Sequence, residues 1–169
     1  MPEPRDWAEP FRRQASEDLL GAQAAYEAGA FSTYCMLMQM VFEKLAKAAF
    51  ARSGAPVPRN HQVATRLIEV LRRTPAGGAI MIGGDRTLAA IQELEAAHPA
   101  VVADAVRRGA ATQYPQLEYP WENASAGAVE WPGEHLPMAR RVKDPADRIG
   151  ADLLKTARAF LKHFDAMFP

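Results

Sequence analysis

The chain has 169 residues, of which 49% are apolar and 24% are charged, values typical of one globular domain with a sizeable core. The formal net charge is zero, the longest apolar runs are far shorter than a membrane span, and the single cysteine, Cys35, excludes an intramolecular disulfide. We therefore expect one cytoplasmic domain over residues 1–169 that has no contact with a membrane.

The charge is unevenly distributed along the chain. Residues 1–43 carry three arginines against seven acidic residues, whereas residues 44–73 carry seven lysines and arginines against Glu69 alone. A positive block of this kind can attract an anionic ligand or nucleic acid. A positive block is also typical of the solvent-exposed face of a helix. The sequence leaves both interpretations open.

The first predicted helix extends from about residue 6 to residue 28. Its apolar residues recur at steps of four and three, which predicts a stripe that faces the core. The residues of this stripe are Trp7, Phe11, Ala15, Leu19, Ala22 and Tyr26. A short link with glycine at residues 27–31 predicts an antiparallel hairpin with the next helix.

The second predicted helix begins at Phe31 and ends before a turn that contains Gly54, Pro56 and Pro58. One face of this helix is an apolar stripe that includes Cys35, so we expect a buried and unreactive thiol. A second, polar line on the helix has four-residue spacing and consists of Gln39, Glu43 and Lys47. This spacing predicts an ion pair between Glu43 and Lys47.

The segment QMVFEKLAKAAFARSGAPVPRNHQV, residues 39–63, resembles the signature of the HEPN domain (higher eukaryotes and prokaryotes nucleotide-binding). In that family a helix with the pattern Q-x-x-x-E-K-x-x-K-A precedes a turn with glycine and a histidine that opens the next helix. The matching residues are Gln39, Glu43, Lys44, Lys47, Ala48, Gly54 and His61. The resemblance implies a single all-α domain, an antiparallel up-and-down bundle of four to five helices.

The sequence pattern in the middle of the chain predicts two or three further helices. The third helix begins near Asn60 or His61 and is closed by Pro75. Residues 74–85 contain four glycines around an apolar centre and lack the lysine of a phosphate loop, so we expect a flexible loop whose centre docks on the core. A fourth helix opens near residue 86 and reaches a break at Pro99. Residues 100–109 are predicted either to continue this helix or to form a separate short one.

Residues 110–145 are rich in proline, glycine, tyrosine and tryptophan, and they show no sustained periodicity. We predict an irregular insertion, a long loop held by its own aromatic residues, before the last helix. Four glutamates and no basic residue lie between Glu118 and Glu134. The last helix is predicted to have Asp144 as its N-cap and Pro145 as its first residue, and its apolar face extends to Phe168.

Resemblance to the family supplies one catalytic candidate. Many HEPN proteins are metal-independent ribonucleases in which four to six residues separate an arginine from a histidine that follows it. There the imidazole acts on the 2′-hydroxyl, and the arginine stabilises charge on the phosphate. Arg158 and His163 match this spacing, but Ala159 replaces the usual polar residue and five helical residues rotate by about 140°. We favour chance occurrence, and we lean towards a protein that is not an enzyme.

A ligand-binding candidate lies in the positive block. Arg59, Asn60 and His61 are predicted to begin a helix, whose free N–H groups favour anions, and Arg52 and Arg59 are candidate ligands of a phosphate or carboxylate. For His61 we favour a structural role that fastens the turn to neighbouring helices. The four histidines are too scattered for a metal motif, so we predict neither a metal nor a cofactor.

Three functions follow from these observations. The first is a non-catalytic HEPN module that binds a nucleotide, another anionic ligand or a nucleotidyltransferase-type protein partner, as the resemblance implies. The second is a toxin-like ribonuclease that uses Arg158 and His163 on RNA, and the third is a purely structural helical adaptor. A homodimer is expected for all three, so dimerisation does not separate them.

Overall fold

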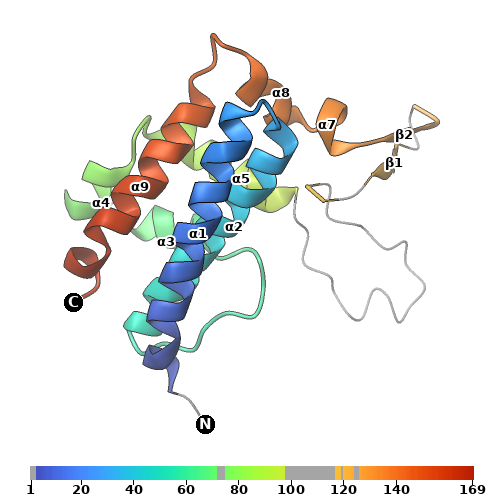
Figure 1. Ribbon diagram of the computed structural model, residues 1–169. Coiled ribbons are helices and arrows are strands. Elements are labelled where there is room, and N and C mark those ends of the chain that lie inside the picture. The colour runs from blue at the N-terminus through green and yellow to red at the C-terminus, as the bar shows by residue number, and fades with distance from the viewer. Residues whose placement is uncertain (1–2, 72–74, 98–116, 119, 124–125) are drawn as a thin grey trace, which may run out of the picture.

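The computed structural model describes residues 3–71, 75–97, 117–118, 120–123 and 126–169 (Figure 1). The elements are η1 (Pro4–Trp7), α1 (Ala8–Glu27), α2 (Phe31–Arg52), α3 (Ala64–Leu71), α4 (Pro75–Ile80), α5 (Asp85–Ala96), β1 (Trp121–Asn123), β2 (Ala128–Glu130), α7 (Pro132–His135), α8 (Pro137–Lys143) and α9 (Ile149–Met167). The helix expected at residues 100–109 lies outside the described residues. No described helix combines the length and the apolarity that crossing a membrane requires.

The bundle is built around the long hairpin of α1 and α2, which make the most extensive contact between two elements (Figure 1). The link between them is as short as predicted, and Gly29 turns the chain there with a φ of 74°. Helices α5, α8 and α9 pack on α2, and α9 also contacts α1. The predicted all-α bundle is therefore confirmed, and α2 is its central helix.

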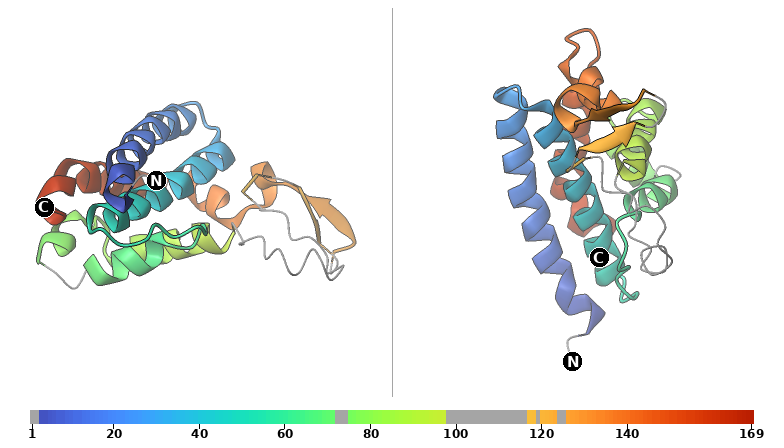
Figure 2. Two further views of the ribbon diagram at one scale, coloured as in Figure 1. Left: turned by 90° about the horizontal axis from the view of Figure 1, so that it is seen from below. Right: turned by 90° about the vertical axis from the view of Figure 1, so that its right-hand side faces the viewer.

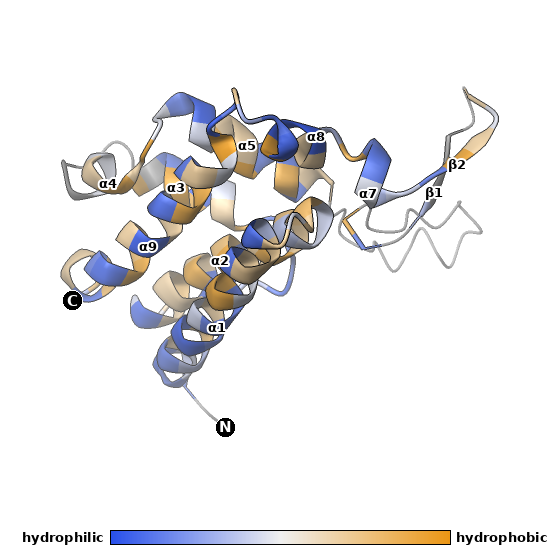
Figure 3. Cartoon of the chain, turned by 45° about the horizontal axis from the view of Figure 1, so that its top comes forward, coloured by the Kyte–Doolittle hydropathy of each residue, from blue (hydrophilic) through white to orange (hydrophobic). Residues whose placement is uncertain are grey.

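Helix α2 is central because it is apolar over most of its circumference, as its colouring in Figure 3 shows. A helix of this kind is stable only when several neighbours cover it. The stripe predicted for α2 is buried from Tyr34 onwards, including Cys35 and Met38, and Phe31 at its start is half-buried. The hydroxyl of Tyr34 donates a hydrogen bond of 2.7 Å to the carbonyl oxygen of Gly150, which fixes α2 against the start of α9.

The stripe predicted for the first helix is confirmed except at its first residue. Ala15, Leu19 and Ala22 are buried against α2, but Trp7 is 47% exposed. Trp7 belongs to the 3-10 turn η1, in which 3.0 residues make one turn, so the helical spacing cannot be extrapolated back to it.

The predicted start of the third helix is wrong. Helix α3 begins at Ala64, and residues 55–63 run along the bundle without helical structure. The carboxylate of Glu95 on α5 accepts hydrogen bonds from the backbone N–H groups of Ala64, at 2.6 Å, and Thr65, at 3.2 Å. The helix therefore begins where α5 supplies its cap, and not at His61.

Residues 75–80 were predicted to be part of a flexible loop, and they form the short helix α4 instead. The expectation that the apolar centre of this segment docks on the core is confirmed, because Ile80 is buried. The N–H of Ile82 donates to Oγ1 of Thr156 at 3.1 Å, which ties the segment to α9. Contacts with α9 thus order a segment that is rich in glycine.

The predicted irregular insertion is also partly regular. Its described part contains the antiparallel β1–β2 hairpin and the helices α7 and α8. Met138, Ala139 and Val142 of α8 are buried against α2 and its neighbours. Seven residues are too few to establish a helical period, and the short apolar face of α8 therefore went unrecognised.

The last helix begins at Ile149, so the N-cap predicted at Asp144 is wrong. One carboxylate oxygen of Asp144 accepts from the N–H of Ala146 at 2.9 Å, and Asp147 accepts from the N–H of Ile149 at 3.0 Å. The two aspartates stabilise a turn between α8 and α9. The apolar face of α9 is as predicted, with Phe160 and Phe164 fully in the core.

Candidate functional site

The polar line on α2 is the centre of a buried network. Glu43 is only 3% exposed, and its Oε1 accepts a hydrogen bond of 2.6 Å from Nζ of Lys47, which confirms the predicted ion pair. Its other oxygen lies 2.8 Å from Nδ1 of His61 and accepts from Nε2 of Gln39 at 3.2 Å. The same Gln39 nitrogen donates to the backbone oxygen of His61 at 3.3 Å. The network thus fastens the end of the 55–63 segment to α2.

The electrostatics of this network keep Glu43 ionised. Burial by itself raises the pKa of a carboxyl group, but the hydrogen bonds from Lys47 and His61 outweigh it and lower the pKa of Glu43 below its ordinary value. A buried carboxylate with these partners holds the Lys47 ammonium in one place. The role favoured for His61, that of fastening the turn, agrees with this geometry.

Lys47 also lines a pocket of about 500 Å³ that lies between the beginning of the chain and the turn after α2. We call this the Lys47 pocket, and its described lining consists of Pro4, Trp7, Phe11, Lys47, Val57, Pro58 and Arg59. The ring centroids of Trp7 and Phe11 are 6.2 Å apart, and Nζ of Lys47 is 6.0 Å from the centroid of Phe11. Two aromatic rings and two cations therefore share one depression.

The chemistry of the Lys47 pocket suits an anion that carries a flat or apolar group. Its described lining includes no carboxylate, and the nearby carboxylate of Asp6 accepts a hydrogen bond from the N–H of Glu3. Arg59 is exposed and has no carboxylate partner among the described residues. A guanidinium in this setting can form bidentate hydrogen bonds with a phosphate or a carboxylate.

Comparison with known proteins identifies the fold family. The family model of the HEPN domain matches residues 8–97, which is more than half of the chain. This chain belongs to the HEPN domain family. No curated protein and no solved structure matches it. The matched range extends from α1 to just after α5, so it contains the Glu43 network and Phe11, Lys47, Val57, Pro58 and Arg59 of the Lys47 pocket.

The structure separates the four ligand residues predicted for this HEPN chain. Only Arg59 lines the Lys47 pocket. Nε of Arg52 donates to the backbone oxygen of Phe168 at 3.1 Å, Asn60 is exposed, and His61 contacts Glu43. The free helix start expected at these residues does not exist, because α3 begins later and Glu95 caps it.

Sequence reasoning missed Lys47, Trp7 and Phe11 as components of a pocket. Trp7 and Phe11 were assigned to the core, and Lys47 was assigned to an ion pair within one helix. The signal that was present is the positive block that begins at Lys44. That block points to this end of α2, but it cannot show that η1 lies beside it.

The proposed ribonuclease residues of the HEPN chain lie elsewhere. Arg158 and His163 are both exposed on α9, and neither lines the Lys47 pocket. Nη2 of Arg158 donates to Oε1 of Gln23 on α1 at 2.7 Å. The pair is open to solvent, and its guanidinium is held against the first helix.

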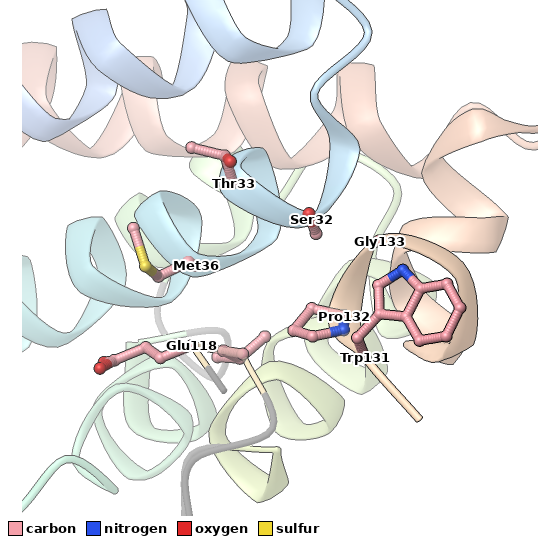
Figure 4. Close-up of a pocket in the computed structure, with 8 residues that line it drawn as sticks. Ser32, Thr33, Met36, Glu118, Trp131, Pro132 and Gly133 are labelled. Atoms are coloured by element: carbon pink, nitrogen blue, oxygen red, sulfur yellow. The ribbon is translucent and has the colours of Figure 1, made fainter. Parts of the chain in front are cut away.

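A second depression, of about 490 Å³, lies between the start of α2 and α7 (Figure 4). Its described lining consists of Ser32, Thr33, Met36, Leu117, Glu118, Trp131, Pro132 and Gly133. Because this lining includes no cation, the depression is less suited to an anion than the Lys47 pocket. Trp131 is 44% exposed at its edge.

The part of the chain that the structure describes offers neither a metal cluster nor a reactive thiol. Within the described residues, no group of three or more histidine, cysteine, aspartate or glutamate side chains is arranged to hold a metal ion. Burial raises the pKa of the Cys35 thiol to about 12, so the reactive thiolate is not formed at neutral pH. The Lys47 pocket combines two cations with two aromatic rings, and for that reason it is the candidate functional site.

Proposed function

We propose that this HEPN protein is a non-catalytic, cytoplasmic and homodimeric binding module that holds a nucleotide or a similar anionic ligand in the Lys47 pocket. The observation that carries the proposal is the composition of the pocket, in which Lys47 and Arg59 are the charged residues and Trp7 and Phe11 form an aromatic wall. A phosphate would contact the two cations. A base would lie against the exposed indole of Trp7.

Two further features support binding at this place. The ammonium of Lys47 is held by Glu43 before any ligand arrives, so little conformational freedom is lost when an anion binds. The volume of the pocket, about 500 Å³, falls within the range of small-molecule sites. Arg59 would then provide most of the recognition, since its guanidinium is exposed and is not paired with a described carboxylate.

The variant Arg59→Ala is expected to weaken the binding of ATP, GTP or a cyclic nucleotide by about tenfold, because a hydrogen bond to a charged group is lost. Isothermal titration and thermal shift would measure the effect. Arg52→Ala is the matched control, because it removes the same charge from a residue outside the pocket. An equal loss in both variants, or no response of the wild-type protein to any nucleotide, would contradict this assignment.

The alternative occupant of the same pocket is an acidic surface of a nucleotidyltransferase-type protein partner, which the family resemblance suggests. This alternative uses the same two cations, so Arg59→Ala would also weaken it. This form of the proposal would be favoured if the protein does not bind nucleotides but copurifies with such a partner, and if Arg59→Ala abolishes the copurification. If neither a nucleotide nor such a partner binds, a purely structural helical adaptor becomes the better description of this protein.

The ribonuclease function remains the second candidate, because Arg158 and His163 are both accessible to solvent. We expect that expression of the wild-type chain does not arrest growth, and that the purified dimer does not cleave RNA. The reason is that the usual polar residue after the arginine is Ala159 here. Growth arrest that disappears in both Arg158→Ala and His163→Ala would establish the enzyme instead.

A further inference from the structure

The two cations of the Lys47 pocket have different surroundings. Nζ of Lys47 donates to Oε1 of Glu43 at 2.6 Å, and the two side chains are 13% and 4% exposed. Arg59 is exposed and has no carboxylate partner among the described residues. Lys47 therefore comes to the pocket together with a buried negative charge, whereas Arg59 brings a full positive charge.

Glu43 lies behind Lys47 and is not itself part of the pocket wall. The described lining contains Lys47 and Arg59, and it includes no carboxylate. The second oxygen of Glu43 lies 2.8 Å from Nδ1 of His61 and accepts a hydrogen bond from Gln39. Because both oxygens are held in this way, the carboxylate stays beside the ammonium when an anion reaches the pocket.

An anion bound to Lys47 would lie close to this carboxylate. The pocket forms where η1 packs on α2, and in the right-hand view of Figure 2 η1 and the turn after α2 both lie at the lower end of the bundle. A phosphate oxygen that accepts a hydrogen bond from an ammonium group lies about 2.8 Å from its nitrogen. The phosphate and the Glu43 carboxylate are then about 4–6 Å apart, a distance at which like charges repel each other within a protein.

This repulsion grows with every negative charge that the ligand carries. Two cations and one carboxylate, Lys47, Arg59 and Glu43, leave the site with a net charge of plus one. The remaining described lining is apolar, so it offers no further group to balance charge. A phosphate monoester carries about two negative charges at neutral pH. A phosphate diester lacks the second ionisable oxygen and carries only one.

We propose that Glu43 makes the Lys47 pocket selective for a phosphate diester that has one negative charge and a flat group, such as a cyclic nucleotide, over phosphate monoesters and polyphosphates. Glu43 does not touch the ligand, and it determines specificity through its effect on Lys47. The proposal rests on the nucleotide site proposed above and adds the class of phosphate that this site takes.

Isothermal titration of the full chain with three related ligands tests the selectivity. Cyclic AMP and the phosphate methyl ester of AMP are diesters, whereas AMP is a monoester. At about pH 8.5, where an imidazole is usually neutral, we expect both diesters to bind about tenfold more tightly than AMP. The methyl ester separates charge from ring closure, since it differs from AMP only by a methyl group on the phosphate.

The variant Glu43→Gln tests whether the buried carboxylate causes the preference. It removes the negative charge and keeps the shape of the side chain, so the preference for the diesters should fall to about threefold or less. The readout is the ratio of two dissociation constants, which a uniform weakening of the pocket does not change. Glu93→Gln is the control and should keep the ratio of the wild type, because it makes the same charge change on α5, outside the pocket.

Each outcome decides a different part of the proposal. If the wild type binds AMP as tightly as the methyl ester, the selectivity is wrong, although the nucleotide site stands. If Glu43→Gln retains the full preference, Glu43 is not its cause. The comparison of ligands on the wild type remains decisive even when this variant does not fold. If the wild type binds none of the three ligands, the nucleotide site itself is contradicted, and the selectivity with it.

Discussion

Replacing Glu43 by alanine is expected to lower the free energy of unfolding by about 3–5 kcal/mol, the usual cost of removing one partner from a buried ion pair. Glu43 is 3% exposed, and its carboxylate is the acceptor for Lys47 and Gln39 and the neighbour of His61. Without it the Lys47 ammonium loses its partner in a largely buried position. The 55–63 segment also loses its attachment to α2.

Urea unfolding followed by circular dichroism would measure this loss. Glu43→Gln keeps the shape of the side chain and one hydrogen-bond acceptor. We therefore expect it to lower the free energy of unfolding less than Glu43→Ala does. Glu9→Ala is the control, because Glu9 forms a half-exposed pair with Arg12 and an exposed pair with Arg13, and such surface pairs contribute less than about 1 kcal/mol. If Glu43→Ala costs no more than Glu9→Ala, the network does not hold the fold together.

The pH dependence of stability gives the same assignment a second test. The pKa of Glu43 is lowered in the folded chain from an ordinary value of 4.5, so its stabilising effect is present above pH 4.5. That effect is lost as the pH falls through the lowered folded pKa, where the carboxylate takes up a proton. The difference in stability between the wild type and Glu43→Ala should therefore shrink in acid below pH 4.5. A difference that stays constant there would show that the charge of Glu43 is not what stabilises the fold.

Replacing Glu95 by alanine is expected to cost about 2–4 kcal/mol, because two charge-assisted hydrogen bonds to the backbone are lost at once. The carboxylate of Glu95 is 7% exposed and accepts from the N–H groups of Ala64 and Thr65. Removing it leaves the start of α3 without these partners. Since α3 follows the 55–63 segment, the wall of the Lys47 pocket should loosen as well.

Hydrogen exchange would locate the effect of Glu95→Ala, which should first remove protection from the amides of Ala64 and Thr65. Glu95→Gln retains an acceptor and should cost less than alanine. Glu93→Ala is the matched control on the same helix, because Glu93 forms a half-exposed pair with Arg141 at 3.0 Å. Exchange that rises equally throughout the chain, or only in α5, would contradict the capping role.

Contacts within one helix of the site are predictable from the sequence, whereas contacts between distant segments are not. The pair of Glu43 and Lys47 was predictable, because residues four apart on a helix are neighbours whatever surrounds them. The contact of His61 with Glu43 spans 18 residues and crosses a turn, so its geometry depends on where that turn lies. Arg59 was found from its charge, whereas Trp7 was placed in the core because its 3-10 turn broke the helical period.

The sequence by itself determined the long helices α1, α2 and α9, the burial of Cys35 and the HEPN signature. Each of these depends on a regular spacing within one helix, and that spacing is set by local backbone geometry. Only the tertiary structure decided where α3 begins, because its cap comes from Glu95, 31 residues away. The tertiary structure alone brings Trp7, Lys47 and Arg59 together in one pocket. It also places the hairpin away from that pocket. Contacts between distant segments depend on how whole elements pack, and no local pattern encodes that packing.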